Sequence, residues 1–228
     1  MNRLALDTSS LACTVAIIVG DEVLERHEEQ AREHTRLLMP MIRDVLDEAG
    51  VSLNSLDAIV LGNGPGSFIG MRIAASVAQG LAYGAGLGII PVSSLAAIAA
   101  ELMVEPDAHT VAVAQDAHMH EVYLGLYERG ADGLPRPLCD ERLQPERVID
   151  ELSRREPQSI LAGGQGWERY PALFAANEPW LAGKPRVRFP RAHYLLALSR
   201  LGSPIDAGEL KPAYLRHKVA EKPAQRGP

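Results

Sequence analysis

Cysteine is nearly absent from this chain of 228 residues, which contains only Cys13 and Cys139. The two lie far apart and form no Cys-x-x-Cys pair, so the sequence indicates neither a disulfide scaffold nor a zinc knuckle. Long apolar runs are also missing. No stretch approaches about 18 apolar residues, and the opening MNRLALDTSS lacks the apolar core of a signal peptide. We therefore expect a soluble, cytoplasmic protein with no membrane segment.

Basic residues are fewer than acidic ones, 23 against 29, which gives a net charge of −6. This balance argues against a protein that binds nucleic acid by itself over a wide surface, although it allows a local patch or contact through a partner. The one basic stretch is at the C-terminus, where we expect residues 216–228 to form a flexible, solvated tail. A contact of this tail with tRNA or a partner is the second interpretation.

Lysine is rarer still, and all four lysines lie from Lys184 onward. This bears on the glycine-rich stretch GNGPGSFIGMR, residues 62–72, which stands between an expected strand at 56–61 and an expected helix at 69–83. Such loops often bind phosphate through backbone N–H groups. This loop, however, has neither the Walker spacing with its lysine nor the Rossmann glycines. A tight turn that lets the helix pack closely on its sheet is therefore favoured.

One pattern occurs twice along the chain. An apolar strand ends at Asp7, and a polar turn and a second strand follow; the same order recurs at Asp116. The first hairpin precedes an expected helix at 33–49, the strand at 56–61 and the glycine loop. The second precedes an expected helix at 145–155, the strand SILAGG and the glycine turn Gly163–Gly166. A further strand and helix follow in each half, the second pair being VRF and the helix at 191–202.

This order predicts a duplicated α/β fold, with chance similarity between α/β segments as the alternative. Two subdomains are expected, residues 1–106 and 107–215, each with a mixed sheet flanked by helices. The actin-like ATPases and sugar kinases, with their ribonuclease H-like motif, are built in this way. In those folds the first hairpin turn wraps nucleotide phosphates, so the candidate cofactor-binding residues are Asp7, Thr8, Ser9 and Ser10. Capping the turns by side-chain-to-backbone bonds is the simpler role for Asp7 and Asp116.

Several stretches together resemble the bacterial TsaB (YeaZ) family, in the family's order and over nearly the full length: LALDTSSLACTVAI, REHTRLLMPMI, GNGPGSFIGMRIAASVAQGLA, PVSSLAAIA, DAHMHEVY, GWERYP and PAYLRHKVA. The resemblance implies an actin-like (ASKHA) fold without catalysis of its own and without a cofactor. It also implies a partner role beside a larger paralogue, the transferase TsaD, which modifies adenine 37 of tRNAs reading ANN codons. The ATPase TsaE and a homodimer are further implied partners, and tRNA is contacted only indirectly.

The sequence departs from the family pattern at three positions, where Ile69 replaces threonine and His118 and His120 replace arginine and glycine. The catalytic paralogue carries a His-x-x-x-His pair on a helix, and Ser94 and Ile98 stand at the comparable positions here. We therefore predict no catalytic residues and no metal site. His118 and His120 could share a metal, but exposed loop histidines are the favoured interpretation because no third ligand is evident.

Two expected helices carry more apolar surface than one sheet needs to cover. Small residues at i, i+4 spacing in the helix after the glycine loop suggest a face that another helix can approach closely, beside an apolar stripe. The predicted partner interface comprises Leu37, Met41, Val45, Gly70, Ile73, Ala74, Val77 and Leu81. The alternative is that both faces belong to the core. A second functional hypothesis, an actin-like ATPase or small-molecule kinase that uses the Asp7–Ser10 turn, also stays open.

Overall fold

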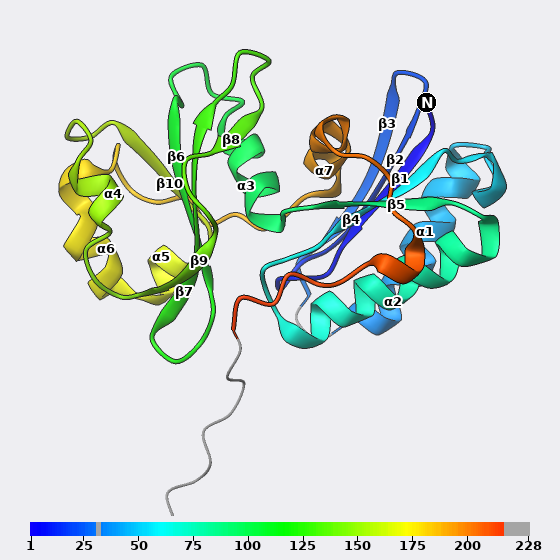
Figure 1. Cartoon of the computed structure of the whole chain (residues 1–228), viewed down its shortest axis with the longest axis horizontal. Coiled ribbons are helices and arrows are strands. Elements are labelled where there is room, and N and C mark those ends of the chain that lie inside the picture. The colour runs from blue at the N-terminus through cyan, green and yellow to red at the C-terminus, as the bar shows by residue number, and fades with distance from the viewer. Residues whose placement is uncertain (31–32, 217–228) are drawn as a thin grey trace, which may run out of the picture.

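The computed structural model describes residues 1–30 and 33–216, and these form two halves, each built around a five-stranded mixed sheet (Figure 1). The first sheet has the order β3-β2-β1-β4-β5. Its strands are β1 (Arg3–Asp7), β2 (Cys13–Val19), β3 (Glu22–Glu28), β4 (Ala58–Gly62) and β5 (Gly88–Val92). β1, β2 and β3 form an antiparallel meander, whereas β4 and β5 extend the sheet in parallel with β1.

Helices cover both faces of the first sheet. α1 (His34–Glu48) and α2 (Phe68–Ala85) pack on the face that presents Leu4, Leu6 and other large apolar side chains. α7 (Ala192–Leu198) packs on the opposite face, where Ala5, Ala16 and Ala58 leave room for a closely packed helix. Side chains alternate between the faces of a strand, so these consecutive apolar residues supply both layers.

The second sheet repeats the plan of the first. Its order is β10-β6-β7-β8, with β9 also pairing β7. The strands are β6 (Thr110–Asp116), β7 (Glu121–Arg129), β8 (Pro135–Pro137), β9 (Arg142–Pro145) and β10 (Ile160–Gly163). β6 pairs antiparallel with β7 and parallel with β10, as β1 does with β2 and β4. The predicted duplicated α/β fold is therefore confirmed, and Asp7 and Asp116 each end the first strand of a half.

The helices of the second half are shorter than expected. They are α4 (Asp150–Ser153), α5 (Gly166–Arg169) and α6 (Pro171–Asn177). Elsewhere in the described chain, short 3₁₀ turns occur at Leu53–Ser55, Glu178–Trp180, Ser199–Leu201 and Ala207–Glu209. The predicted helix at 145–155 is wrong in its first part, because Pro145 ends a strand that pairs with β7. The expected strand VRF is also wrong: residues 187–189 are not a strand, and the nearest pairing is a single bridge between Gly163 and Arg186.

Two helices connect the halves rather than staying with their neighbours in sequence. α3 (Ser94–Leu102) follows the first sheet, yet its large residues Leu95, Ile98 and Leu102 pack against the second sheet. α7 follows the second sheet in sequence and packs on the first. Figure 1 shows both helices between the two sheets. Core contacts therefore cross the expected boundary between residues 106 and 107. That residues 1–106 and 107–215 are separate subdomains stays a prediction.

The last described segment returns across both halves. Ile205 forms an antiparallel bridge with Ile89, Ala213 donates its N–H to the Asn63 carbonyl (3.2 Å), and Arg216 donates to the Glu121 carboxylate (2.6 Å). The predicted tail lies almost wholly outside the described residues, since only Arg216 is included. Within the described ranges, no helix combines the length and the apolar character that crossing a membrane requires.

Candidate functional site

The glycine loop packs directly on the Asp7–Ser10 turn. Ser67 donates its N–H to the Ser9 carbonyl (2.6 Å), and the Thr8 hydroxyl donates to the Gly70 carbonyl (2.7 Å). A Cβ at Gly66 would overlap the Ser9 carbonyl, and one at Gly70 would overlap the Thr8 carbonyl. Glycine is needed here because two backbones approach each other more closely than a side chain allows. The close-packing interpretation of the glycine loop is confirmed.

Asp7 lies at the centre of this contact and is fully buried. Its Oδ1 accepts the N–H of Ser9 (2.6 Å), and its Oδ2 accepts the hydroxyl of Ser94. The same hydroxyl accepts the N–H of Gly64 (3.0 Å). Burial raises the pKa of the Asp7 carboxyl, while the hydrogen bonds from Ser94 and Ser9 oppose the rise. The carboxyl thus joins β1, the glycine loop and α3, and it does not face solvent.

The Asp7–Ser10 turn, the predicted phosphate-binding site, is closed to solvent over most of its length. Thr8 and Ser9 are buried, and Ser10 is half-buried with its hydroxyl accepting the N–H of Ala12 (3.1 Å). His34 on α1 adds a contact, since its Nε2 lies 3.0 Å from the Ser10 carbonyl. Burial lowers the pKa of His34, so the neutral ring, protonated at Nε2, is the donor. A phosphate on this turn would have to displace the glycine loop. This geometry argues against phosphate binding by Asp7, Thr8, Ser9 and Ser10, which stays a prediction.

The corresponding turn of the second half is open. Asp116 again accepts an N–H two residues on, from His118 (2.8 Å), and the Tyr170 hydroxyl also donates to it (2.7 Å). Burial and this carboxylate raise the pKa of Tyr170 to about 12, which keeps the hydroxyl a donor. His118, Met119 and His120 all have φ between 55° and 61° and are exposed. This left-handed backbone is uncommon for residues other than glycine.

The two histidines of this turn do not converge on one point. Their Nδ1 atoms lie near different carboxylates, His118 at 3.3 Å from Asp116 and His120 at 2.7 Å from Glu146. Each imidazole therefore has its own carboxylate neighbour. In residues 1–30 and 33–216, no three or more His, Cys, Asp or Glu side chains are grouped to hold a metal ion.

The positions comparable to the paralogue's histidine pair have structural roles. Ser94 binds the Asp7 carboxyl, as described above, and Ile98 is fully buried in the core between α3 and the second sheet. Neither side chain reaches solvent. A hydroxyl engaged by a carboxyl and a buried alkyl group cannot coordinate a metal as two imidazoles do.

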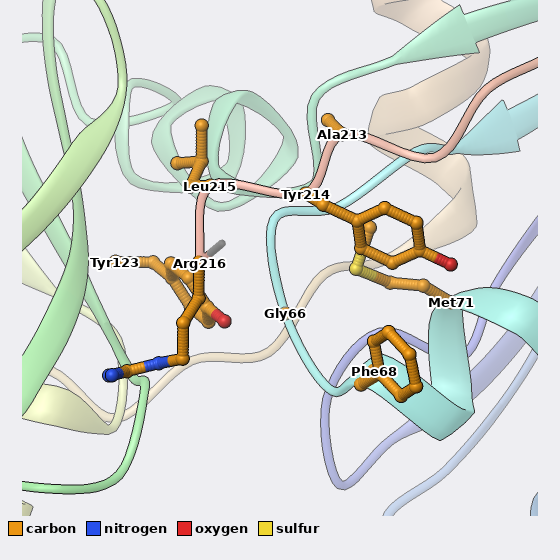
Figure 2. A pocket seen from close by; sticks show the side chains of 8 residues that line it. All are labelled: Gly66, Phe68, Met71, Tyr123, Ala213, Tyr214, Leu215 and Arg216. Carbon is orange, nitrogen blue, oxygen red and sulfur yellow. The ribbon is translucent and has the colours of Figure 1, made fainter. Parts of the chain in front are cut away.

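Two of the hollows formed by the described residues are of interest as ligand sites. The first lies where the C-terminal segment passes between the halves and has a volume of about 40 Å³, with lining residues that include Phe68, Met71, Tyr123, Tyr214 and Arg216 (Figure 2). Ligand pockets usually span several hundred Å³, so this hollow is too small for a nucleotide. The second, of about 330 Å³, lies beside Gly164 in the second half and is lined mainly by apolar and aromatic side chains, among them Trp167 and Phe174.

The eight residues of the predicted partner interface fall into a buried group and a half-buried group. Met41, Val45, Gly70 and Ala74 are buried within the chain, so the expectation that they face a partner is wrong. The small residues point inward because α2 has to lie close to its own sheet and to the Thr8 carbonyl. The other four residues are half-buried at the edge of the core: Leu37, Ile73, Val77 and Leu81.

The outer face of α2 carries exposed residues that were not among the predicted interface residues. Ile69 is 71% exposed and Tyr83 is 88% exposed. Ser76, Gly80 and Gly84 are also exposed, and a Cβ at either glycine would meet no atom within 4 Å. Their i, i+4 spacing was visible in the sequence, but it equals that of Gly70, Ala74 and Ala78. Periodicity alone could not show which small face was turned outward.

Comparisons with known proteins agree with this architecture. The family model described as "TsaD: tRNA N6-adenosine threonylcarbamoyltransferase" matches residues 19–162. The protein named tRNA threonylcarbamoyladenosine biosynthesis protein TsaB from Haemophilus influenzae is 37% identical over 97% of this chain and 96% of its own length. Its Escherichia coli namesake is 34% identical over 97% of both chains.

Solved structures give the same result. A Pseudomonas aeruginosa protein described as similar to peptidase YEAZ superposes with a TM-score of 0.83 at 37% identity, covering 94% of this chain and 99% of its own. YeaZ from the same organism gives a TM-score of 0.79 at 35% identity with the same coverage.

The repeated hairpins, the two mixed sheets and the glycine loop packed on the first Asp turn together define a duplicated α/β protein of the actin-like class. With near-full-length relatives at 34–37% identity, the chain belongs to the TsaB (YeaZ) family, as the sequence motifs predicted.

Proposed function

We propose that this protein is a non-catalytic subunit in the biosynthesis of threonylcarbamoyladenosine at position 37 of tRNAs reading ANN codons. In this proposal it binds the transferase TsaD, called the sister subunit below, and holds it in a productive complex with the ATPase TsaE. The names of the relatives support the pathway. Buried Asp7, Thr8 and Ser9, and structural roles for Ser94 and Ile98, support a role without chemistry.

The observation that carries the scaffold role is the outer face of α2. Ile73, Val77 and Leu81 form a half-buried ridge, and exposed Gly80 and Gly84 lie beside it. A glycine inside a helix costs about 1 kcal/mol relative to alanine. Within the described structure no neighbouring atom requires glycine at either position. A close approach by another helix would require both, and it would cover the ridge at the same time.

The sister subunit is the proposed occupant of this face. The family model named for the transferase matches residues 19–162, a range that contains both α1 and α2. The transferase family therefore has counterparts of these helices, which supports a packing of helix pair against helix pair. A second copy of this chain would use the same surface as a homodimer. In the proposal tRNA is contacted only through the complex, in the cytoplasm, and no cofactor is needed.

The test is Gly80→Glu, which places a charge on the outer face without disturbing the core. We expect far-UV dichroism to match the unmodified protein and Tm to be equal or slightly higher, because the new side chain enters open space and glutamate has a higher helix propensity than glycine. Binding to the sister subunit in calorimetry should fall by at least a hundredfold. Modification of tRNA by the reconstituted complex should fall to the level seen when this chain is omitted.

The matched control is Val104→Glu, another charge at an exposed position, 68% accessible, just beyond the end of α3. This variant should bind and support modification normally. Equal binding by Gly80→Glu and Val104→Glu would contradict the proposed use of the α2 face.

An actin-like ATPase or small-molecule kinase is the second candidate. The hollow of about 330 Å³ beside Gly164 favours it, because its size and aromatic lining are typical of small-molecule sites. The closed Asp7–Ser10 turn opposes it. Calorimetry of the isolated chain with Mg-ATP decides between the two: tight magnesium-dependent binding supports the kinase, and weak or absent binding supports the scaffold.

A further inference from the structure

Three side chains form an ordered cluster at the N-terminal end of α2, which we call the anchor cluster: Phe68, Arg72 and Tyr214. The Arg72 guanidinium carbon lies 3.8 Å from the centroid of the Phe68 ring. Its Nε donates to the Tyr214 hydroxyl (3.0 Å), and the two aromatic rings have centroids 5.3 Å apart. Figure 2 shows the rings of Phe68 and Tyr214 on the α2 side of the small hollow. Stacking and a hydrogen bond thus hold the arginine in one orientation.

The terminal nitrogens of Arg72 are available for a further contact. Among the described residues, only Nε of this guanidinium is engaged in a hydrogen bond, and no carboxylate lies within ion-pair distance. The side chain is exposed and is the only charged one in the 18 residues of α2. An arginine that is already oriented loses less conformational entropy on binding. Its two free terminal NH₂ groups match the two oxygens of a carboxylate.

Tyr214 is supplied by a segment that the structure holds firmly in place. Asn63 in the glycine loop accepts the N–H of Ala213 (3.2 Å), and its side-chain amide donates to the Lys211 carbonyl (3.0 Å). Two residues further on, Arg216 donates to the Ala117 carbonyl (3.0 Å) and to the Glu121 carboxylate (2.6 Å). The C-terminal segment is therefore held by hydrogen bonds on both sides of the tyrosine, whose hydroxyl lies at the start of α2.

The anchor cluster is continuous with the outer face of α2. Ile69, 71% exposed, lies between Phe68 and the next turn of the helix, and Ile73 directly follows Arg72. Aromatic residues and arginine, with apolar residues around them, are the composition typical of residues that dominate binding energy at protein interfaces. A phosphate backbone would require several cations; α2 offers Arg72 and the C-terminal segment adds Lys211, while Arg216 is already paired with Glu121. The patch therefore fits a protein surface better than a nucleic acid.

We propose that the anchor cluster is the polar end of the partner face and that Arg72 binds a carboxylate on the helix pair of the sister subunit. This inference rests on the proposed function. It adds the C-terminal segment to the interface through Tyr214, and it assigns the facing surface an acidic residue. Apolar packing along the α2 ridge has no unique register, and one oriented ion pair at its end sets the register.

The experiment measures the affinity of the full-length chain for the sister subunit by calorimetry, at low and high salt, for Arg72→Gln, Arg72→Lys and Tyr214→Phe. Arg72→Gln should weaken binding at least tenfold and should reduce the salt dependence. Arg72→Lys should bind nearly as weakly, because a lysine cannot form two parallel hydrogen bonds. Tyr214→Phe should weaken binding about threefold, since the stacking stays and the orienting hydrogen bond is lost. Arg154→Gln, at an exposed arginine of the second half, is the matched control and should bind normally.

The outcomes separate this inference from the proposed function. If Arg72→Gln binds within twofold of the unmodified chain while Gly80→Glu does not bind, the anchor is wrong and the scaffold role stands. If both variants bind normally, the proposed interface fails as well. If Arg72→Gln alters tRNA binding by the complete complex but not the affinity for the sister subunit, the ligand is a phosphate and the inference is overturned.

Discussion

At the scale of single residues, glycine has opposite roles within one helix. Gly70 in the first turn of α2 faces the Thr8 carbonyl, and any Cβ there would overlap it. Gly80, less than three turns later, faces open space. Intrinsic helix propensity favours alanine over glycine at both positions. The difference between the two positions therefore comes entirely from what each backbone meets.

This difference predicts opposite signs for one substitution. Gly70→Ala should destabilise the protein by about 1–3 kcal/mol, because the β-turn and the helix must separate to admit a methyl group. Gly80→Ala should stabilise it by roughly 0.5–1 kcal/mol, because the helix gains propensity and nothing is displaced. Urea unfolding of the two variants measures both values. A shift of the same sign in both would contradict the packing described here.

At the scale of elements, α3 and α7 are exchanged between the halves. α3 presents leucine and isoleucine to the second sheet and the small residues Ala97 and Ala100 to the layer that includes α7. α7 in turn buries Leu195 and Leu196 against the alanine-rich face of the first sheet. Each sheet therefore depends on a helix that the other half's stretch of sequence contributes.

The exchange predicts the behaviour of a fragment. Residues 1–106 alone should not unfold cooperatively, because the fragment lacks α7 over one face of its sheet and leaves the apolar side of α3 exposed. The far-UV dichroism of the fragment should change gradually with temperature, whereas the whole chain should show a sigmoidal unfolding transition. A sharp transition for the fragment would mean that residues 1–106 form an independent domain after all.

At the scale of the whole molecule, two adjacent serines at the start of α3 connect carboxyl groups from both halves. Ser94 donates to Asp7 of the first half. Ser93 donates to Glu141 of the second half, which also accepts the hydroxyl of Tyr127 on β7. Burial raises the pKa of the Glu141 carboxyl, and the hydrogen bonds from Ser93 and Tyr127 oppose the rise. The connection between the halves is thus polar and sensitive to protonation, fully buried at Asp7 and Ser94 and half-buried at Ser93 and Glu141.

The sign of that sensitivity follows from linkage. Because the pKa of Glu141 in the folded state lies above its ordinary value of 4.5, the folded state binds this proton more tightly than the unfolded state does. The stabilising contribution is complete below the ordinary value and is lost as pH rises through the folded-state pKa. Glu141→Gln removes this titration, so the stability of the variant relative to the unmodified protein should increase as pH rises from 4.5. Urea unfolding across that range measures the difference, and a pH-independent difference would contradict it.

Much of the fold and part of the site were predictable from the sequence. The strand–Asp–turn–strand repeat identified both hairpins, since β-branched and apolar runs ending in a polar turn are a local signal. The helix at 33–49 agrees with α1 to within a residue at each end. The short helices of the second half were not predictable in the same way, because Pro145 takes part in a strand only through its pairing with Glu121, a residue distant in sequence.

The two hairpins, the duplicated plan and the family were determined by the sequence alone, because each depends on local patterns and on motifs that can be read along the chain. The direction of the small-residue faces of α2, the exchange of α3 and α7, and the meeting of Tyr214 with Arg72 were decided only by the tertiary structure. Periodicity shows which side chains share a face of a helix. It does not show what that face meets, because the contacts join residues such as Arg72 and Tyr214 that are 142 positions apart.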